Sequence, residues 1–386
     1  MLKQKVRDWQ IDELGDIFIF QNKTGRKAGE GLGGGKYKFF TSSSKQTKFI
    51  KECDFDGEYL IFATGGQAGI HYCKGKFSAS NDCFVVKIND KILTKYIYYY
   101  LSAKIYLLEE GFLGAGLRHV SKDYIKKIRI KYHKNEEAQQ KIVSILEKAE
   151  NLKDRRKKSN GETNKIIQSI FYGMFGGYLK DKKKFKKIED FVSKDKNAIK
   201  AGPFGSSLKK ECYVKKGYKI YGQEQVIKDD LTFGDYYISE EKYRELENYK
   251  VQEGDILISL VGTYGKISII PKIFQPGIIN PRLMKITLDK NKMNPIFFKF
   301  LFLSDAILRE LENNSHGGTM NIVNVGIIKR IDFHLPPIQL QNQFAKHVQK
   351  IEKIKQHQQK SEQEINTLFD ALMQKAFKGE LVKNGK

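Results

Sequence analysis

The sequence predicts an α+β protein with an internal repeat, in which two tandem mixed α/β domains are each followed by a long helix. Two recurring segments support this prediction: a helical one repeats at an offset of 202 residues, and a shorter strand-like one at 197. A chain of 386 residues with 40% hydrophobic content is also long enough to bury two cores.

The helical repeat aligns residues 144–179 with residues 346–381 without a gap. Apolar residues recur at threes and fours in both copies, as on one face of a helix. The expected stripes are Leu146, Ala149, Leu152, Ile166 and Ile170 in the first copy, and Val348, Ile351, Ile354, Leu368 and Leu372 in the second. Since one apolar stripe packs against another, we expect the two copies to form a coiled coil.

A polar stretch interrupts each stripe, at residues 153–165 and 355–364. The helix either breaks there, at Asn160-Gly161 in the first copy, or continues through a polar layer that sets the register of the coil. The offset of 202 stays constant across this stretch and favours the continuous helix.

The strand-like repeat aligns residues 57–65 with residues 254–262, and Ile70 meets Ile267 at the same offset of 197. In both copies a turn leads into a short apolar strand and then into a glycine-rich loop. Each domain is therefore expected to contain several short strands.

Other elements follow at matching places in each copy. Helices packed on the sheet are expected at residues 96–108 and 296–311, and short strands at residues 128–130 and 331–333. Pro336-Pro337 starts the second long helix, where a missing N–H has no cost. The resulting segments are domains at 1–134 and 179–335, and long helices at 135–178 and 336–386.

The chain is strongly basic, with 69 Lys and Arg against 45 Asp and Glu and a net charge of +24. Such a surplus attracts a polyanion through counterion release, which makes nucleic acid the first partner to consider. The alternative is a lysine-rich surface that is merely solvated.

Several classes of protein lack support in the sequence. The cysteines, Cys53, Cys73, Cys83 and Cys212, show no metal-ligand spacing, so neither a zinc site nor a disulfide framework is indicated. No apolar run approaches the ~20 residues that span a bilayer, and no signal peptide is visible, so we expect a cytoplasmic protein without a membrane partner.

Catalytic motifs are also missing. The nearest string to the Asn/Asp-Pro-Pro-aromatic motif of an amino methyltransferase is Asn280-Pro281-Arg282-Leu283, which lacks the second proline and the aromatic residue. The glycine cluster at residues 31–35 lacks the strand and helix of a phosphate-binding loop. No catalytic residue, metal ligand or bound cofactor is therefore expected in this chain.

Three motifs, in this order, resemble the specificity subunit of type I restriction-modification systems. They are Ala201-Gly202-Pro203-Phe204-Gly205-Ser206-Ser207-Leu208-Lys209, the run at residues 254–259, and Gly317-Gly318-Thr319 ahead of Leu335-Pro336-Pro337-Ile338. The resemblance spans essentially the whole chain. The first domain departs from the pattern, since it has no Gly-Pro-Phe-Gly.

The resemblance implies a non-catalytic chain with two target recognition domains, residues 1–134 and 179–335, separated by two antiparallel spacer helices. Each domain would read half of a bipartite site on double-stranded DNA. Two methyltransferase subunits acting on adenine would dock on the helices, and translocase-endonuclease restriction subunits would join them. S-adenosylmethionine, ATP and magnesium would belong to these partners. A helix of roughly 40 residues spans about 60 Å, enough to separate the two readers by more than one turn of DNA.

Residues that could contact DNA are polar side chains in glycine-rich loops, since base edges require paired donors and acceptors and phosphates require cations. In the first domain they are Thr41, Ser42, Ser43, Ser44, Lys45, Gln67, Asn81, Arg118 and His119. In the second they are Ser206, Ser207, Lys209, Lys210, Gln223, Gln225, Thr263, Tyr264, Lys266, Asn280, Arg282, His316, Thr319 and Asn321. Arginine suits guanine and an amide suits adenine. For each of them, an ordinary turn residue is the alternative.

Three other functions remain open at this point. The chain could serve a system whose nuclease and methyltransferase are fused in one partner. It could also be an autonomous DNA-modifying enzyme, although neither copy shows a repeated catalytic constellation. A coiled-coil adaptor would instead bind DNA weakly and with little dependence on salt.

Overall fold

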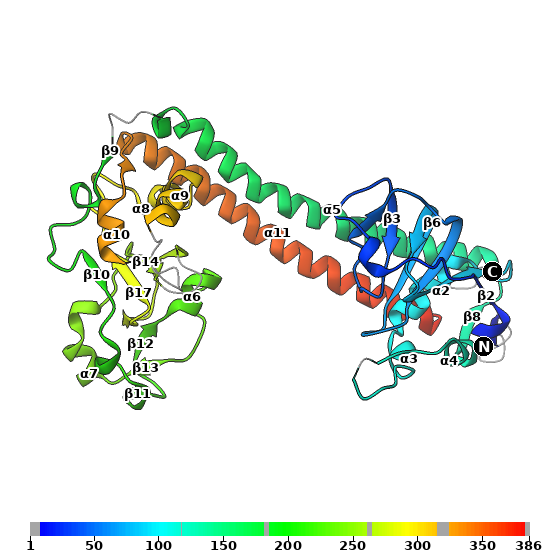
Figure 1. The fold of residues 1–386 in the computed structure, drawn as a ribbon. Coiled ribbons are helices and arrows are strands. Elements are labelled where there is room, and N and C mark those ends of the chain that lie inside the picture. Colours follow the sequence, from blue (N-terminus) through cyan, green and yellow to red (C-terminus); the bar gives the residue numbers. More distant parts are fainter. Residues whose placement is uncertain (1–7, 117, 181–184, 261–264, 315–323, 383–386) are drawn as a thin grey trace. The chain divides into compact units, whose positions relative to one another are not determined.

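The structure is a computed structural model that describes residues 8–116, 118–180, 185–260, 265–314 and 324–382 (Figure 1). The chain divides into two compact units. Unit 1 comprises Met1–Ser159 and Gln358–Lys386, and unit 2 comprises Asn160–His357. The division falls within both long helices, so each unit contains a globular region and a part of each helix. The four consecutive segments expected from the sequence therefore differ from the compact units.

Unit 1 is built around a six-stranded sheet in the order β2-β7-β5-β6-β3-β4. Its strands are β2 (Phe18–Phe20), β3 (Tyr37–Phe40), β4 (Lys48–Ile50), β5 (Phe55–Ala63), β6 (Ile70–Ala79) and β7 (Cys83–Ile88). All neighbours are antiparallel except the parallel pair β3 and β6. Gly57 and Gly75 face each other across β5 and β6 with φ of 139° and 99°, values that favour glycine.

The two faces of this sheet bury different side chains. Leu60 and Phe62 lie in the core that the sheet shares with the helices, whereas Ile61 packs with Phe40 and Phe77 in a second, smaller core. Unit 1 also contains β1 (Trp9–Glu13), which pairs with β8 (Arg129–His133), and two 3-10 helices, η1 (Leu14–Asp16) and η2 (Ala28–Glu30). Its α-helices are α2 (Thr94–Ala103), α3 (Tyr106–Glu109), α4 (Lys122–Lys127) and parts of α5 (Glu136–Phe175) and α11 (Ile338–Lys378).

Unit 2 repeats this arrangement with two four-stranded sheets, in the orders β10-β17-β14-β15 and β11-β13-β12-β16. The strands are β10 (Ile199–Ala201), β11 (Tyr213–Val214), β12 (Tyr218–Tyr221), β13 (Tyr237–Ile238), β14 (Ile256–Ser259), β15 (Ile267–Ile269), β16 (Gly277–Ile279) and β17 (Leu283–Ile286). The short pair β9 (Phe185–Lys186) and β18 (Phe333–His334) corresponds to β1 and β8. The helices are α6 (Gln223–Lys228), α7 (Glu240–Glu245), α8 (Pro295–Phe302), α9 (Asp305–Asn314) and α10 (Val325–Arg330).

The two units share one strand order, because β6 of unit 1 corresponds to β15 and β16 together. β3 pairs in parallel with the end of β6, and β12 pairs in parallel with β16. In unit 1, Gly57 and Gly75 allow β6 to continue as a single strand that pairs first with β5 and then with β3. In unit 2 the strand ends at Ile269, and Pro271 follows in the break, where proline cannot donate a ladder hydrogen bond.

The strand alignment predicted from the sequence needs one correction. Ala63 pairs with Cys83 and Ser259 pairs with Leu283, which places β5 on β14 at an offset of 196 and not 197. A shift of one residue moves every side chain to the other face of a sheet. With the offset of 196, Ile61 corresponds to Leu257, and both lie in the smaller cores.

The predicted alignment of Ile70 with Ile267, at an offset of 197 residues, is confirmed, since these residues start β6 and β15. Ala63 N donates to Gly69 O, and Ser259 N donates to Lys266 O, both at 2.9 Å. The loop between the two strands is therefore one residue longer in unit 2. The alignment of residues 57–65 with residues 254–262 has no gap, so it does not reveal this insertion.

Each predicted sheet-packed helix is two helices in the structure. Residues 96–108 span α2 and α3, since Lys104 leaves the helical conformation (φ −126°, ψ 44°). Residues 296–311 span α8 and α9, where the Ser304 hydroxyl donates to Leu301 O at 2.6 Å and ends the first helix. The strands expected at 128–130 and 331–333 lie slightly later, as β8 and β18, because Ile128 and Ile331 end the preceding helices α4 and α10.

The long helix α5 continues through Asn160-Gly161 without a break, as the constant offset indicated. Within unit 1, Ile142 and Leu146 of α5 share a core with Met373 and Ala376 of α11. In unit 2, the later residues Ile167, Phe171 and Phe175 of α5 share a core with Phe344 and Val348, early residues of α11. Further along α5 in unit 1, Lys153 lies over the ring of Phe369, which precedes Met373 in α11, so the two helices run in opposite directions there.

The buried stripe of the helices differs in part from the predicted one. Leu146, Ala149, Val348 and Ile351 are buried, and Ile170 and Leu372 pack against the cores. Leu152, Ile166, Ile354 and Leu368 are about half exposed. The buried face of α5 passes instead through polar residues, including Thr163, before it reaches Ile167. The spacing of apolar residues alone therefore does not predict a buried stripe that includes polar residues.

Candidate nucleic-acid interface

A tight turn at one end of the sheet in unit 2 carries two of the predicted contact residues, Asn280 and Arg282. Asn280 N donates to Tyr221 O at 2.9 Å, and Leu283 N closes the turn on Asn280 O at 3.1 Å. The side-chain Oδ1 of Asn280 accepts from Arg282 N at 2.9 Å. The backbone around Arg282 is therefore fixed, while its side chain is exposed.

Unit 1 has the same turn at residues 80–83. Ser80 N donates to Phe40 O at 2.8 Å, and Cys83 N donates to Ser80 O at 3.1 Å. The position of Arg282 is taken by Asp82, which is also exposed. The strand on the other side matches too, since Thr64 N donates to Asp82 O and Leu260 N donates to Arg282 O, both at 3.0 Å.

The turn lies at the end of the sheet opposite the start of the long helix. In unit 1, β7 runs from Cys83 to Ile88, and α2 then begins beside Gln139 of α5, which accepts from Leu93 N at 2.9 Å. Six residues of strand, about 20 Å, thus separate the turn from this junction. β17 runs in the same sense in unit 2. We call this end of each sheet the polar edge: residues 41–45, 64–69, 80–83 and 118–119 in unit 1, and 202–210, 222–223, 265–266 and 280–282 in unit 2.

The Gly-Pro-Phe-Gly motif belongs to the polar edge of unit 2. Gly202 N donates to Leu283 O at 2.8 Å, and a Cβ on Gly202 would collide with the backbone oxygen of Asn280. Only glycine fits there. Phe204, two residues further on, is 85% exposed, and Ser206, Lys209, Lys210 and Lys266 are exposed around it; Ser207 is half-buried.

The polar edge of unit 1 gathers most of the residues predicted there. The Ser42 and Thr64 hydroxyls both donate to Asp82 O at 2.8 Å. His71 Nε2 donates to Ser43 O at 2.9 Å, and burial lowers the pKa of His71, so this ring is neutral near pH 7. Gln67, Ser43, Ser44 and Lys45 are exposed, and Thr41 is half-buried.

Two further predicted residues of unit 1, Arg118 and His119, join the same edge. Gly66 N donates to Arg118 O at 3.0 Å, and His119 Nδ1 lies 3.2 Å from Thr64 O. Both side chains are exposed. The loop that bears them therefore lies directly against the loop after β5.

Two predicted amides have structural roles. Gln225 is 2% exposed, and its Oε1 accepts from Gly222 N at 3.0 Å, so it holds the start of α6 and is not open to a base. Gln223, in the same turn, is half-buried. Asn81 Oδ1 accepts from Gly25 N at 2.9 Å.

Other predicted residues, namely Thr263, Tyr264, His316, Thr319 and Asn321, lie outside the residues that the structure describes.

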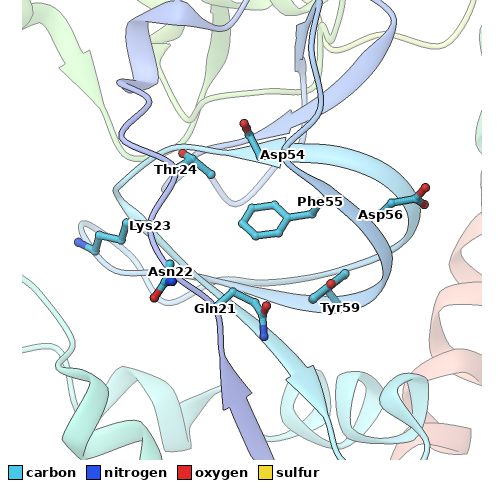
Figure 2. Close-up of a pocket in the computed structure, with 8 residues that line it drawn as sticks. All are labelled: Gln21, Asn22, Lys23, Thr24, Asp54, Phe55, Asp56 and Tyr59. Atoms are coloured by element: carbon cyan, nitrogen blue, oxygen red, sulfur yellow. The ribbon is translucent and has the colours of Figure 1, made fainter.

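A polar pocket of about 370 Å³ lies beside this edge in unit 1, between the chain after β2 and the start of β5 (Figure 2). Figure 2 shows the Phe55 ring pointing into the space framed by Gln21, Asn22 and Tyr59. Arg26 Nε and Nη2 bind Asp54 at 2.7 and 3.0 Å. Burial favours the neutral acid, but Arg26 and Ser78 outweigh it and lower the pKa of Asp54.

Three residues with roles at these sites, Gln139, Gln341 and Asp82, were not predicted from the sequence. Gln139 and Gln341 are buried and make the same contacts in the two units. They stand 202 residues apart, so extending the helical alignment by five residues would have found them. Asp82 was missed because its equivalence to Arg282 depends on strand pairing.

The described residues contain no group of three or more His, Cys, Asp or Glu side chains placed to hold a metal ion. Within the same residues, no helix is long and apolar enough to cross a membrane.

Comparison with known proteins adds a family model. The model described as the type I restriction modification DNA specificity domain matches the chain twice, at residues 6–165 and 180–367. Both globular regions and most of both long helices lie within these matches.

Among curated proteins, the chain is 23% identical to the type I restriction enzyme MjaVIII specificity subunit of Methanocaldococcus jannaschii. That match covers 98% of this chain and 94% of the relative. A shorter segment of 67 residues, 17% of this chain and 20% of the relative, is 46% identical to the MpnII specificity subunit of Mycoplasma pneumoniae.

Among solved structures, a type I restriction-modification S subunit from M. genitalium superposes with a TM-score of 0.61 at 14% identity, over 96% of both chains. A chain from a structural study of complex assembly in the type I R-M system gives 0.58 at 15% identity, over 97% of this chain and 98% of that one. These two likenesses show the fold.

Proposed function

Because the chain belongs to the family of type I restriction modification DNA specificity domains, we propose that it recognises a two-part DNA site, with one half read by each unit. The observation that carries this proposal is the polar edge. Both units present the same turn in the same hydrogen-bonded frame, but with different exposed side chains. Two units that share one architecture but expose different side chains are suited to two different half-sites.

The charge of the chain supports DNA as the ligand. Its net charge of +24 can neutralise phosphates, and exposed lysines such as Lys45, Lys209 and Lys266 lie at the polar edges. Phosphate contacts position a protein on a duplex, while base contacts provide the sequence preference. In this proposal the lysines contact phosphates, and the turn residues contact bases.

The long helices are assigned to partner subunits. Leu152 and Ile354 are equivalent at the offset of 202 and are 50% and 51% exposed, and Ile166 and Leu368 are equivalent and 48% and 51% exposed. Unit 1 contains Leu152 and Leu368, and unit 2 contains Ile166 and Ile354. Each unit thus offers an equivalent pair of apolar side chains, two leucines in unit 1 and two isoleucines in unit 2, which fits two copies of a methyltransferase subunit on an antiparallel coiled coil.

Catalysis is assigned to these partners. In this proposal S-adenosylmethionine, ATP and magnesium bind to the methyltransferase and restriction subunits. The present chain determines which DNA sequence the complex recognises in the cytoplasm. Purified chain incubated with duplex DNA, magnesium and S-adenosylmethionine should show no turnover. Turnover without a partner would contradict the assignment.

Methylation mapping tests the proposed function directly. DNA from cells that carry the chain with its methyltransferase partner should be modified at one two-part sequence with a spacer of constant length. Replacing residues 185–335 with the corresponding region of another family member should change one half of the site and leave the other intact. Modification without regard to a two-part sequence would overturn the proposal.

A further inference from the structure

We propose that Arg282 and Asp82 are equivalent specificity-determining residues. Arg282 reads a guanine in the half-site of unit 2, and Asp82 reads the amino group of a cytosine or adenine at the corresponding place in the half-site of unit 1. This inference rests on the proposed function and names the residues that make the two half-sites differ.

The equivalence of the two residues follows from backbone contacts. In each unit the residue lies between a turn closed at 3.1 Å and a neighbouring loop that donates to its carbonyl oxygen at 3.0 Å. The strands on both sides correspond as well, since Cys83 pairs with Ala63 and Leu283 pairs with Ser259. Both Cα atoms are therefore held at the same place in their sheets.

The side chains are free to reach outward. Arg282 is exposed, and no hydrogen bond or ion pair of its guanidinium is present among the described residues. By contrast, Arg26 is bound by Asp54. Asp82 is exposed, and within the described part of the chain its carboxylate accepts one long hydrogen bond, at 3.4 Å from the Ser80 hydroxyl. A fixed backbone with a free head group reduces the entropy lost on binding.

The reversal of charge separates base reading from phosphate binding. Phosphate oxygens only accept hydrogen bonds and carry negative charge, so a position that anchors phosphate needs a cation in both units. Base edges offer both acceptors and donors. Arginine binds O6 and N7 of guanine, and a carboxylate accepts from N4 of cytosine or an equivalent amino group. Of these two roles, base reading is the one that Arg282 in one unit and Asp82 in the other can both serve.

The experiment compares methylation maps for the chain with its partner and for two variants, Arg282→Gln and Asp82→Asn. Each variant should relax or change one base position in one half-site, with a loss of discrimination of about 5- to 150-fold at that position. Arg282→Gln should shift the preference from guanine towards adenine, because an amide suits adenine. The half-site read by the other unit should stay unchanged and shows that the variant complex is assembled.

Matched controls remove the same charges elsewhere. Arg244→Gln changes an exposed arginine on α7, which follows the end of β13 remote from the turn. Asp90→Asn changes an exposed aspartate beyond the opposite end of β7. Both controls should leave the methylated sequence unchanged.

A further variant keeps the charge. Arg282→Lys retains a cation but loses the two-pronged geometry, so base reading predicts weaker selection of guanine, whereas phosphate binding predicts little change. An unchanged sequence with uniformly weaker binding and a shallower salt dependence would overturn the inference and leave the proposed function standing. An unchanged sequence with unchanged affinity would overturn it as well. A wild-type complex without any two-part preference would instead contradict the proposed function itself.

Discussion

Gln341 on the first turn of α11 holds the start of α8, because its Oε1 accepts from the backbone N–H of Asn294 at 2.9 Å. Its Nε2 donates to Pro336 O at 2.7 Å, and the side chain is fully buried. Gln139 repeats this arrangement in unit 1, with Leu93 N at 2.9 Å and His133 O at 2.7 Å. One amide in each unit thus connects the long helix to the globular region.

Gln139→Ala should destabilise unit 1 by about 1–3 kcal/mol, since it leaves buried backbone donors and acceptors without partners. The single tryptophan, Trp9, packs on His133 and reports on this unit by fluorescence during urea unfolding. Gln140→Ala, at the exposed neighbouring position on α5 in the same unit, is the control and should leave the midpoint nearly unchanged. An unchanged midpoint for Gln139→Ala would show that water or a shifted backbone satisfies the freed groups.

Gly202→Ala should disturb the turn that carries Arg282, because the added Cβ would collide with the backbone oxygen of Asn280. We expect weaker selection in the half-site of unit 2 and a lower thermal stability of that unit. Gly161→Ala is the matched control in unit 2, since nothing lies near its Cβ and alanine favours a helix by up to about 1 kcal/mol. Methylation mapping and thermal unfolding measure the two effects. Equal stability of both variants would contradict the predicted collision.

Asp54→Asn should reduce the stability of unit 1 in a pH-dependent way. The pKa of Asp54 is lower in the folded state, so its contribution is complete above the unfolded pKa of about 3.9 and disappears as the pH falls through the folded pKa. Wild type and variant should therefore differ at pH 6 and converge in acid. The measurement is urea unfolding at several pH values, followed by Trp9 fluorescence. A difference that grows in acid would contradict the ion pair with Arg26.

Cys83 should resist alkylation in the folded protein. Its thiol is 4% exposed, and burial raises its pKa to about 12, so the reactive thiolate is absent at pH 8. Cys53 and Cys212 are partly exposed and should react first with iodoacetamide. Peptide mapping by mass spectrometry distinguishes the sites, and full labelling in urea is the control. Rapid labelling of Cys83 would mean that the smaller core of unit 1 opens readily.

Local patterns predicted the long helices well. Helix periodicity and the offset of 202 depend on neighbours three and four residues apart, and α5 and α11 extend over the expected segments. The same logic failed for Leu152 and Ile166, because the buried face of α5 crosses polar residues. Most of the described residues predicted to contact DNA lie at the ends of strands, because glycine-rich loops mark those ends, and their contact with DNA stays a prediction. Gln225 shows that a polar loop residue can instead be a buried cap.

The sequence by itself determined that the chain is a repeat of a mixed domain and a long helix, since composition, periodicity and offset are properties of neighbouring residues. Only the tertiary structure decided the register of β5 on β14, the equivalence of Asp82 and Arg282, and the packing of each globular region against both helices. Phe377 packs on Tyr96 in unit 1, and Phe175 packs on Phe297 in unit 2. These contacts join residues far apart in the chain, and their free energy comes from the burial of both partners, which no local pattern records.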